Sequence, residues 1–158
     1  MGVEIERKFL IRDNSWREQA DSGTEYQQAY LVGSKTASVR VRIEGDRAFL
    51  NIKSATLGIT RQEFEYPIPM DEARAMLKNL CEQPVIDKTR YHLQHEGHTW
   101  EIDEFKGDNA GLLVAEIELA HEDEAFVRPD WLGEEVSADP RYYNVCLVKN
   151  PYKHWKTE

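Results

Sequence analysis

The chain has 158 residues, which suits a single domain with a sizeable core, because single domains usually run to about 100–150 residues. Its 29 acidic and 20 basic residues give a net charge of −9. That charge argues against general binding to nucleic acid or anionic membranes, since both select surplus positive charge. An apolar content of 41% is too high for a disordered chain.

The sequence also lacks the features of a secreted or membrane protein. No apolar run approaches the roughly 20 residues of a membrane helix. The first residues, MGVEIERKFL, carry acids where a signal peptide has basic and then apolar residues. Cys81 and Cys146 each have a leucine beside them, which favours small buried thiols over a disulfide. We therefore expect a cytoplasmic protein.

Alternation of polar and apolar residues with a period of two dominates the chain and predicts antiparallel strands. The predicted strands cover residues 4–9, 26–32, 38–44, 47–53, 59–68, 85–93, 99–105 and 113–119. Helices are expected around 15–20, at 71–80 on the outside of the sheet, at 125–127, and as one short helix with a tail from Pro140. No Gly-, Ser- or Pro-rich linker divides the chain, so residues 1–158 are expected to form one mostly β domain (α+β) with peripheral helices.

The strands carry charge on one face, because alternate side chains of a strand point to the same side. In the first strand, Glu4, Glu6 and Lys8 point one way, and Ile5 and Phe9 point the other. Polar and apolar faces are ordinary in a sheet, but six strands here repeat like-charged pairs two residues apart, which repel at roughly 7 Å. We therefore expect a barrel with a charged interior. Its acids are Glu4, Glu6, Glu63, Glu65, Glu101, Asp103, Glu116 and Glu118, and its bases are Lys8, Arg40, Arg42, Lys53, Lys88 and Arg90.

A charged interior of this kind needs charged ligands, because buried charges are costly unless they are paired, hydrated or bound to ions. Carboxylate clusters suit hard cations such as Mg²⁺ or Mn²⁺, and arginine and lysine clusters suit phosphate oxygens. A small polyphosphate bound with divalent metal ions would satisfy both sets of charges. The expected partner is therefore a small molecule rather than a nucleic acid or a membrane.

The charged pairs follow an order that resembles a known protein family. The ExExK sequence at 4–8 is followed by RVR at 40–42, Lys53, EFE at 63–65, KTR at 88–90, EID at 101–103 and EIE at 116–118. In this order the chain resembles the CYTH superfamily, the triphosphate tunnel metalloenzymes, and among them the short bacterial inorganic triphosphatases. The resemblance implies an eight-stranded antiparallel β-barrel tunnel that binds a linear triphosphate with two Mg²⁺ or Mn²⁺ ions and hydrolyses it to pyrophosphate and phosphate.

The resemblance also implies roles for the interior residues. Tyr30 would act with Lys8 as a catalytic pair, since an adjacent ammonium group favours the phenolate form of a tyrosine. The alternative for Tyr30 is a wall residue with a hydrogen-bonded hydroxyl group. The roles of the acids Glu63, Glu65, Glu101 and Asp103 are not separated. The phosphate positions are Lys8, Arg40, Arg42, Lys53, Lys88 and Arg90, and the metal positions are Glu4, Glu6, Glu116 and Glu118.

Three other functions stay open at this point. A class IV adenylyl cyclase-like enzyme and a thiamine triphosphatase would use the same tunnel, and a noncatalytic module would bind polyphosphate without cleaving it. No adenine-recognition motif supports the cyclase. The sequence also leaves open whether the protein is a homodimer, and whether the segment RYYNVCL at 141–147 seals one end of the tunnel.

Overall fold

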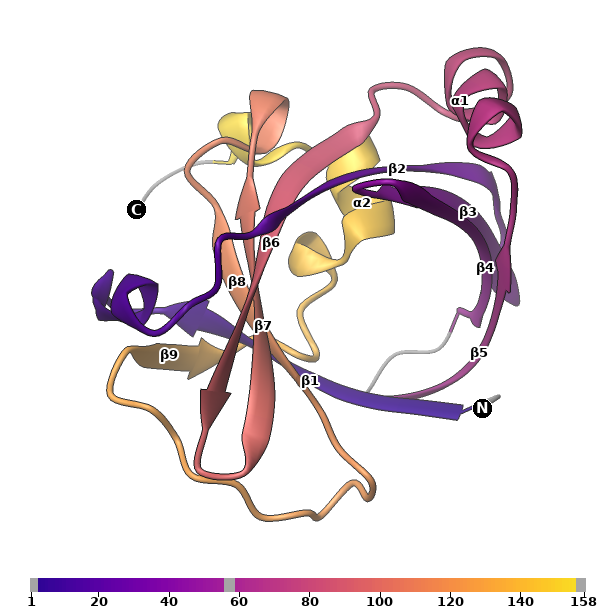
Figure 1. Cartoon of the computed structure of the whole chain (residues 1–158). Helices are drawn as coiled ribbons and strands as arrows, with labels where there is room; N and C mark the ends of the chain where they lie inside the picture. Colours follow the sequence, from indigo (N-terminus) through magenta and orange to yellow (C-terminus); the bar gives the residue numbers. More distant parts are fainter. Residues whose placement is uncertain (1–2, 56–58, 156–158) are drawn as a thin grey trace.

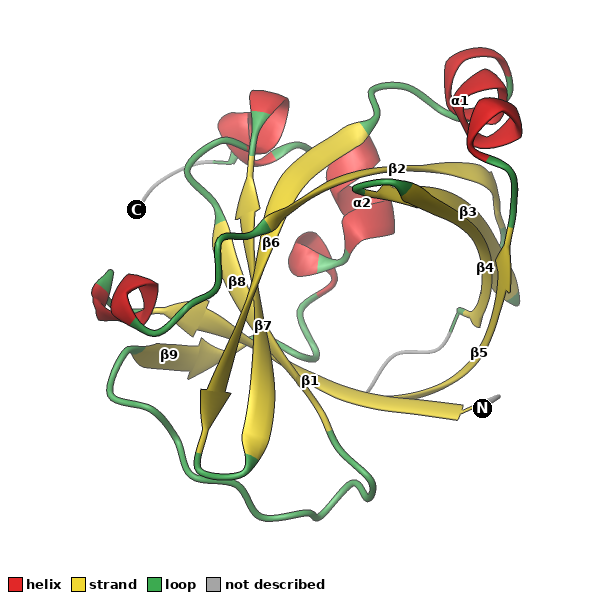
Figure 2. Cartoon of the chain, viewed as in Figure 1, coloured by secondary structure: helices red, strands yellow, loops and turns green. Residues whose placement is uncertain are grey.

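Antiparallel strands close into a barrel in the computed structural model, which describes residues 3–55 and 59–155 (Figures 1 and 2). The strands of the barrel are β1 (Val3–Ile11), β2 (Thr24–Gly33), β3 (Ala37–Glu44), β4 (Arg47–Ser54), β5 (Thr60–Pro67), β6 (Ile86–His95), β7 (His98–Phe105) and β8 (Leu113–Glu118). Their order around the ring is β5-β4-β3-β2-β6-β7-β8-β1, and pairing between β1 and β5 closes it. The predicted fold class, a mostly β chain with an eight-stranded antiparallel barrel, is confirmed.

Strand β1 has three partners along its length. Residues 3–5 pair with β5, and residues 6–10 pair with β8. A ninth strand, β9 (Leu132–Glu135), pairs with β1 at Phe9 and Ile11. The sequence analysis did not predict β9, because four residues are too few to display a clear alternation.

The helix α1 (Met70–Asn79) covers part of the outer surface, as predicted. Pro69 precedes it, and Asp71 and Glu72 lie in its first turn, where acidic side chains are favoured by the helix dipole. Its buried residues Ala73 and Leu77 belong to an apolar cluster with strands β2, β3 and β4. In Figure 1, α1 lies outside the ring of strands.

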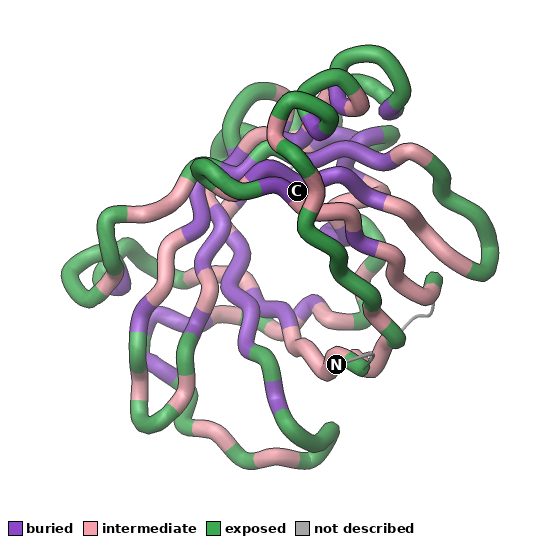
Figure 3. Tube along the Cα trace, turned by 45° about the vertical axis from the view of Figure 1, so that its right-hand side comes forward, coloured by how far each residue is buried: buried purple, intermediate pink, exposed green. Residues whose placement is uncertain are grey.

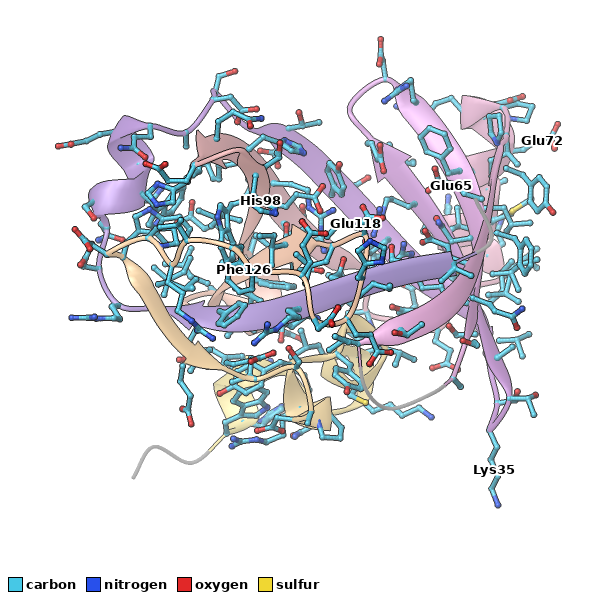
Figure 4. The ribbon with its side chains drawn as sticks, turned by 90° about the horizontal axis from the view of Figure 1, so that it is seen from below. Lys35, Glu65, Glu72, His98, Glu118 and Phe126 are labelled. Atoms are coloured by element: carbon cyan, nitrogen blue, oxygen red, sulfur yellow. The ribbon has the colours of Figure 1, made fainter. Side chains whose placement is uncertain are left out.

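The helix expected at 125–127 is wrong, since these residues form an irregular segment. Phe126 packs edge-on against Phe9 and Trp100, with ring centroids 6.0 and 5.7 Å apart. Its ring also lies 6.3 Å from that of His98, and both residues are labelled in Figure 4. Aromatic packing against the barrel, with Pro129 close behind, therefore decides the conformation here over a weak helical preference.

The C-terminal region forms several short turns of helix where the sequence analysis expected one short helix and a tail. Tyr143 has an extended backbone that separates the first two turns, and Pro151 precedes the last one. The helix expected around 15–20 is likewise a short 3₁₀ turn. No helix among residues 3–55 and 59–155 is long and apolar enough to cross a membrane. The short elements are η1 (Ser15–Glu18), η2 (Gly107–Asn109), η3 (Pro140–Tyr142), α2 (Asn144–Lys149) and η4 (Tyr152–His154).

The outer face of the barrel carries most of the apolar core, and buried stretches run along its strands in Figure 3. One cluster on this face lies under α1. The other centres on Trp100, which is fully buried and packs edge-on against Trp131. That cluster consists of Phe9, Trp16, Leu93, Trp100, Ile102, Ala115, Ile117, Leu119, Trp131 and Leu132.

One end of the barrel interior is apolar. Ile86, Phe105 and Val114 occupy inward positions directly beside the charged stretches of their strands, and all three are buried. They form one cluster with Leu147 and Val148 of α2. In Figure 1, α2 lies within the outline of the barrel. The C-terminal segment therefore seals this end of the barrel with apolar side chains.

Replacing Trp100 with alanine should lower the free energy of unfolding by about 3–5 kcal/mol, because the substitution leaves a cavity in the outer core. Urea denaturation followed by circular dichroism measures this change. The control is Val127→Ala, since Val127 is 53% exposed and its truncation should cost less than about 0.5 kcal/mol. Equal losses in the two variants would contradict this description of the core.

Candidate active site

A cavity of about 260 Å³ lies inside the barrel, beside the apolar end closed by α2. It is compact, since pockets for drug-sized ligands span about 300–1,000 Å³. All eight strands of the ring contribute to its wall, together with the start of α2. The lining residues are Glu4, Glu6, Lys8, Tyr30, Ser38, Arg40, Arg42, Lys53, Arg61, Glu63, Glu65, Arg90, Glu101, Glu116, Glu118, Tyr143, Asn144 and Val145.

The structure brings the predicted interior residues together in one wall. Tyr30 and all of the predicted acids and bases other than Lys88 and Asp103 line the cavity. Glu65 and Glu118, both labelled in Figure 4, are the most exposed of these acids. Lys88 and Asp103 lie behind the lining, where they are 0% and 1% exposed.

Asp103 is the centre of a buried hydrogen-bond network. Lys88 Nζ donates to Asp103 Oδ2 at 2.7 Å, and Arg90 Nε donates to Asp103 Oδ1 at 2.7 Å. Arg90 Nη2 donates to Oδ2 of the same carboxylate at 2.9 Å, which makes the pair bidentate. Arg90 also reaches Glu116 at 3.2 Å and Glu101 at 3.3 Å. Asp103 therefore fixes Arg90 from behind while Arg90 faces the cavity.

Burial and neighbouring charges shift the pKa values in this network. Burial would raise the pKa of Asp103, but the charges of Arg90 and Lys88 outweigh it and lower this pKa to about 2. The pKa of Lys88 falls to about 7, because burial and the charges of Arg90 and Arg42 outweigh the attraction of Asp103. A carboxylate at this point is thus needed to hold two cations in the interior.

Arg40 is buried and has no ion-pair partner among the described residues. The residue is 5% exposed, and its Nε and Nη2 atoms have no hydrogen-bond partner among the described residues. The neighbouring Arg42 is better satisfied, since its Nε donates to Gln28 and its Nη1 lies 3.3 Å from Glu44. Unpaired buried donors of a guanidinium group are costly, so an anion in the cavity would remove that cost.

Lys53 lies between two acids. Its Nζ atom lies 3.2 Å from Glu4 Oε1 and 3.3 Å from Glu63 Oε2. Burial raises the pKa of Glu4, and the charge of Glu63 adds to the effect although Lys53 opposes it. In Glu63 the charge of Lys53 outweighs burial, so the pKa of Glu63 is lowered. One ammonium group thus holds two carboxylates together.

Glu6 and Glu116 are diagonal neighbours on the inner face of β1 and β8, where Glu6 pairs with Glu118 and Lys8 pairs with Glu116. Burial raises the pKa of Glu6 well above its ordinary value, and the charge of Glu116 raises it further. The pKa of Glu116 is lowered well below its ordinary value, because the charges of Lys8 and Arg90 outweigh its burial. Of the two carboxyl groups, that of Glu6 therefore holds its proton more tightly.

The chemistry of these acids fits a divalent cation. Within residues 3–55 and 59–155, no three acidic, histidine or cysteine side chains converge on one point as they lie. However, Glu4, Glu6 and Glu118 all have raised pKa values, caused first by burial and then in part by neighbouring carboxylates. Mutually repelling carboxylate oxygens on one wall form the hard donor set that Mg²⁺ prefers. Glu4, Glu6, Glu116 and Glu118 are thus suitable ligands.

Lys8 and Tyr30 both line the cavity at the end closed by α2. Lys8 is 8% exposed, and its Nζ atom donates to the Tyr142 carbonyl oxygen at 3.1 Å. Tyr30 is 5% exposed and belongs to the apolar cluster that α2 completes. The ring of Tyr30 therefore packs in the seal, while the residue also borders the polar cavity.

The sequence analysis missed several residues of the site. Arg61 lines the cavity from β5, and Tyr143 and Asn144 line it from the C-terminal segment. Asn51 lies behind the wall, where its amide donates to Glu65 at 2.8 Å and to Glu63 at 3.3 Å. The alternation rule could have found Arg61, since it lies two residues before Glu63. Nothing in the local sequence marks Tyr143 and Asn144, because tertiary packing alone brings α2 to the barrel.

Comparisons with known proteins agree with this architecture. Residues 2–143 match the CYTH domain family. The chain is 51% identical over 156 residues to an inorganic triphosphatase of Acetivibrio thermocellus, with 99% of each chain covered. It is 35% identical over 150 residues to an inorganic triphosphatase of Nitrosomonas europaea, with 92% of this chain and 97% of the relative covered. The crystal structure of an inorganic triphosphatase matches with a TM-score of 0.65 and 34% identity, and covers 91% of this chain and 96% of its own.

Replacing Asp103 with asparagine should lower the free energy of unfolding by about 3–5 kcal/mol, because two buried cations then lose their shared carboxylate. Chemical denaturation at neutral pH measures the loss. Asp108→Asn is the matched control, since Asp108 pairs with Lys153 at 3.0 Å on the surface and its loss should cost less than about 1 kcal/mol. A small loss in Asp103→Asn would contradict the role given to this carboxylate.

The lowered pKa of Lys88 predicts a pH-dependent stability. Between pH 7 and 10.5 the unfolded chain binds a proton on this lysine that the folded chain does not, so stability should rise with pH. The rise should reach about 1.4 kcal/mol per pH unit relative to Lys88→Met, which lacks the group. Paired urea titrations of the two proteins between pH 7.5 and 9.5 measure the difference. A constant difference would mean that Lys88 keeps its proton when folded.

Proposed function

The chain belongs to the CYTH domain family, and we propose that it is an inorganic triphosphatase, a metal-dependent hydrolase that cleaves triphosphate to pyrophosphate and phosphate inside the barrel. The observation that carries this proposal is the buried guanidinium group of Arg40, which has two unpartnered nitrogen donors in a wall of bases. A compact, multiply charged anion suits both the volume and the charge of this cavity.

The bases of the wall bind and polarise the phosphate chain. Arg40 and Arg42 offer guanidinium donors from β3, and Lys53 and Arg90 extend the positive surface across the cavity. Lys88 contributes from behind the wall, because its hydrogen bond to Asp103 helps to fix the carboxylate that orients Arg90. Since the charge that develops during phosphoryl transfer lies on phosphate oxygens, preorganised cations here lower the barrier.

Glu4, Glu6, Glu116 and Glu118 would hold the metal, which we propose to be two ions of Mg²⁺ or Mn²⁺. Such ions, when bound, neutralise phosphate charge and lower the pKa of a coordinated water molecule. These carboxylates lie among the bases, since Glu4 pairs with Lys53 and Glu116 pairs with Arg90. We assign no separate role to the other acids of the lining, Glu63, Glu65 and Glu101. Lys53 pairs with Glu63, and Arg90 pairs with Glu101.

The reaction requires a water molecule aimed at a terminal phosphorus atom. The water oxygen forms the new bond to phosphorus, the bridging P–O bond breaks, and pyrophosphate leaves with the bonding electron pair. We assign the removal of the water proton to Tyr30 with Lys8, both of which line the same end of the cavity.

A triphosphate that carries an organic group is the second candidate substrate. A second cavity of about 480 Å³ adjoins the first at Ser38, Arg61, Tyr143 and Val145, and Pro140 and Cys146 give it apolar walls. It could receive an organic group, as an adenylyl cyclase-like enzyme or a thiamine triphosphatase would require. The polar inner cavity nevertheless favours inorganic triphosphate, because its cations address phosphate oxygens.

Three further expectations from the sequence stay predictions. We propose that residues 1–158 act as one tunnel domain, since all eight strands of the ring line a single cavity. A location in the cytoplasm belongs to the same set, and so does the open question of a homodimer in solution. A noncatalytic role in polyphosphate binding is the alternative that the following experiment tests.

The purified protein should release phosphate from inorganic triphosphate in the presence of Mg²⁺, and excess EDTA should abolish the reaction. ATP and thiamine triphosphate, assayed in parallel with product identification, should react more slowly. Arg40→Gln should raise the KM for triphosphate, since it removes a charge that the cavity leaves unpaired. Cyclic AMP formation from ATP with negligible hydrolysis of triphosphate would favour the cyclase, and binding without turnover would favour the noncatalytic module.

Replacing Tyr30 with phenylalanine should lower kcat by about 10²–10⁴-fold with little change in KM, because it removes the acid–base hydroxyl and keeps the buried ring. Steady-state kinetics with inorganic triphosphate separate the two parameters. Tyr91→Phe is the control, since Tyr91 packs edge-on against Trp16 outside the cavity. An unchanged kcat in Tyr30→Phe would rule out the role assigned to this hydroxyl.

A further inference from the structure

Tyr143 lies beside two cations of the cavity wall. The residue is buried between η3 and α2 and lines the cavity. The Nζ atom of Lys8 lies 5.7 Å from the centroid of its ring, and the Cζ atom of Arg61 lies 5.1 Å from the same centroid. Both distances are within the range of cation–π attraction. One aromatic ring thus contacts a base from β1 and a base from β5.

The Tyr143 ring is itself held in place by the C-terminal segment. Its hydroxyl group donates to the Ser137 carbonyl oxygen at 2.7 Å. The Ser137 hydroxyl oxygen in turn accepts a hydrogen bond from the Lys8 backbone N–H at 2.9 Å, and the Tyr142 carbonyl oxygen accepts one from Lys8 Nζ at 3.1 Å. Residues 137–143 therefore connect the backbone and the ammonium group of Lys8 to the ring of Tyr143.

Arg61 differs from Arg42 and Arg90 in how it is held. Arg42 and Arg90 each have a carboxylate within 3.3 Å, at Glu44 and Asp103 respectively. Among the described residues, no carboxylate oxygen lies within the 4.0 Å of an ion pair from Arg61. A ring attracts a cation without cancelling its charge, whereas a carboxylate neutralises it. The positive charge of Arg61 is therefore available to a ligand.

We propose that Arg61 is an additional phosphate-binding residue and that Tyr143 is the positioning residue that places Arg61 and Lys8 together at one end of the substrate. The proposal rests on the proposed function and deepens it. Arg61 lies two residues before Glu63 on the inner face of β5, at the junction of the inner cavity with its neighbour. An end phosphate group of the substrate would receive donors from both bases, while α2 and the Ser137–Tyr143 segment keep the ring in place.

Four single variants and one double variant test the proposal. The single variants are Arg61→Gln, Tyr143→Leu, Tyr143→Phe and the control Arg128→Gln, and the double variant combines the first two. Arg128 is also an arginine over aromatic rings, at 5.1 Å from Phe9 and 5.5 Å from Phe126, but it lies on the outer face of the barrel. Each variant is assayed for kcat and KM with inorganic triphosphate and Mg²⁺. Calorimetry with imidotriphosphate, which resists cleavage, measures binding without turnover.

Arg61→Gln should raise both KM and the Kd for imidotriphosphate by about tenfold or more, with a smaller effect on kcat, since a charge-assisted hydrogen bond is lost. Tyr143→Leu should weaken binding to a similar degree, and Tyr143→Phe should stay close to the native protein because it keeps the ring. In the double variant Arg61→Gln, Tyr143→Leu the two effects should be less than additive in free energy, since the ring acts partly through Arg61.

Two outcomes would overturn the proposal. Native-like binding in Arg61→Gln, as in Arg128→Gln, would show that Arg61 does not contact the substrate. Equal losses in Tyr143→Phe and Tyr143→Leu would show that the hydroxyl bond to Ser137 matters and the ring does not. A native protein that binds imidotriphosphate but hydrolyses no triphosphate would instead refute the proposed function, and the binding measurements would still decide the roles of Arg61 and Tyr143.

Discussion

The interior of the barrel depends on the carboxylate of Asp103, which receives hydrogen bonds from Lys88 and Arg90. A closed ring of eight strands has no free edge past which an inward side chain could turn outward, so each inward charge needs a counterpart from the wall or from a ligand. Asp103 provides that counterpart at the most buried point of the wall. Arg90 can then extend from this fixed anchor to Glu116, Glu101 and the cavity.

Other cations of the wall are held in different ways, and the difference affects what they can bind. Lys53 lies between two carboxylates, so much of its charge is already neutralised. Arg61 lies near the ring of Tyr143, which attracts its guanidinium group without a compensating negative charge, and Lys8 lies near the same ring and also beside Glu116. Arg40 has two donors without any partner among the described residues. The wall thus contains two kinds of cation: those neutralised by neighbouring carboxylates, and those that need an anion from a ligand.

The fold could be predicted from the sequence largely because polar and apolar residues alternate along it with a period of two. In a strand this period places the alternate charged side chains on one face of the sheet. Two residues that are two positions apart share a face of a regular strand. Glu63 and Glu65 of β5 and Arg40 and Arg42 of β3 do so here, because both strands pair with β4 without a shift in register. The same alternation predicts that Arg61 faces the interior. It does not predict the position of α2, which depends on the packing of Leu147 against the end of the barrel.

The sequence also does not predict whether an inward charged side chain lines the cavity or lies buried behind the lining. Lys88 and Arg90 occur in the same KTR segment and share a face, yet only Arg90 lines the cavity. The helix expected at 125–127 failed for a related reason, because Phe126 gains more from contact with Phe9 and Trp100 than a short exposed helix could supply. Local patterns therefore predict which face a residue occupies, and packing decides how deep it lies.

Lys8 and Tyr30 lie at the boundary between the apolar seal, which excludes water, and the cavity, which is lined with charged groups. An apolar plug excludes water from one end, which strengthens every electrostatic interaction beside it. Tyr30 satisfies both sides, since its ring belongs to the plug and the residue also borders the cavity. At the edge of this plug, Lys8 Nζ donates to the carbonyl oxygen of Tyr142. The C-terminal segment thus closes the barrel and, through the same contacts, sets the position of a base in the site.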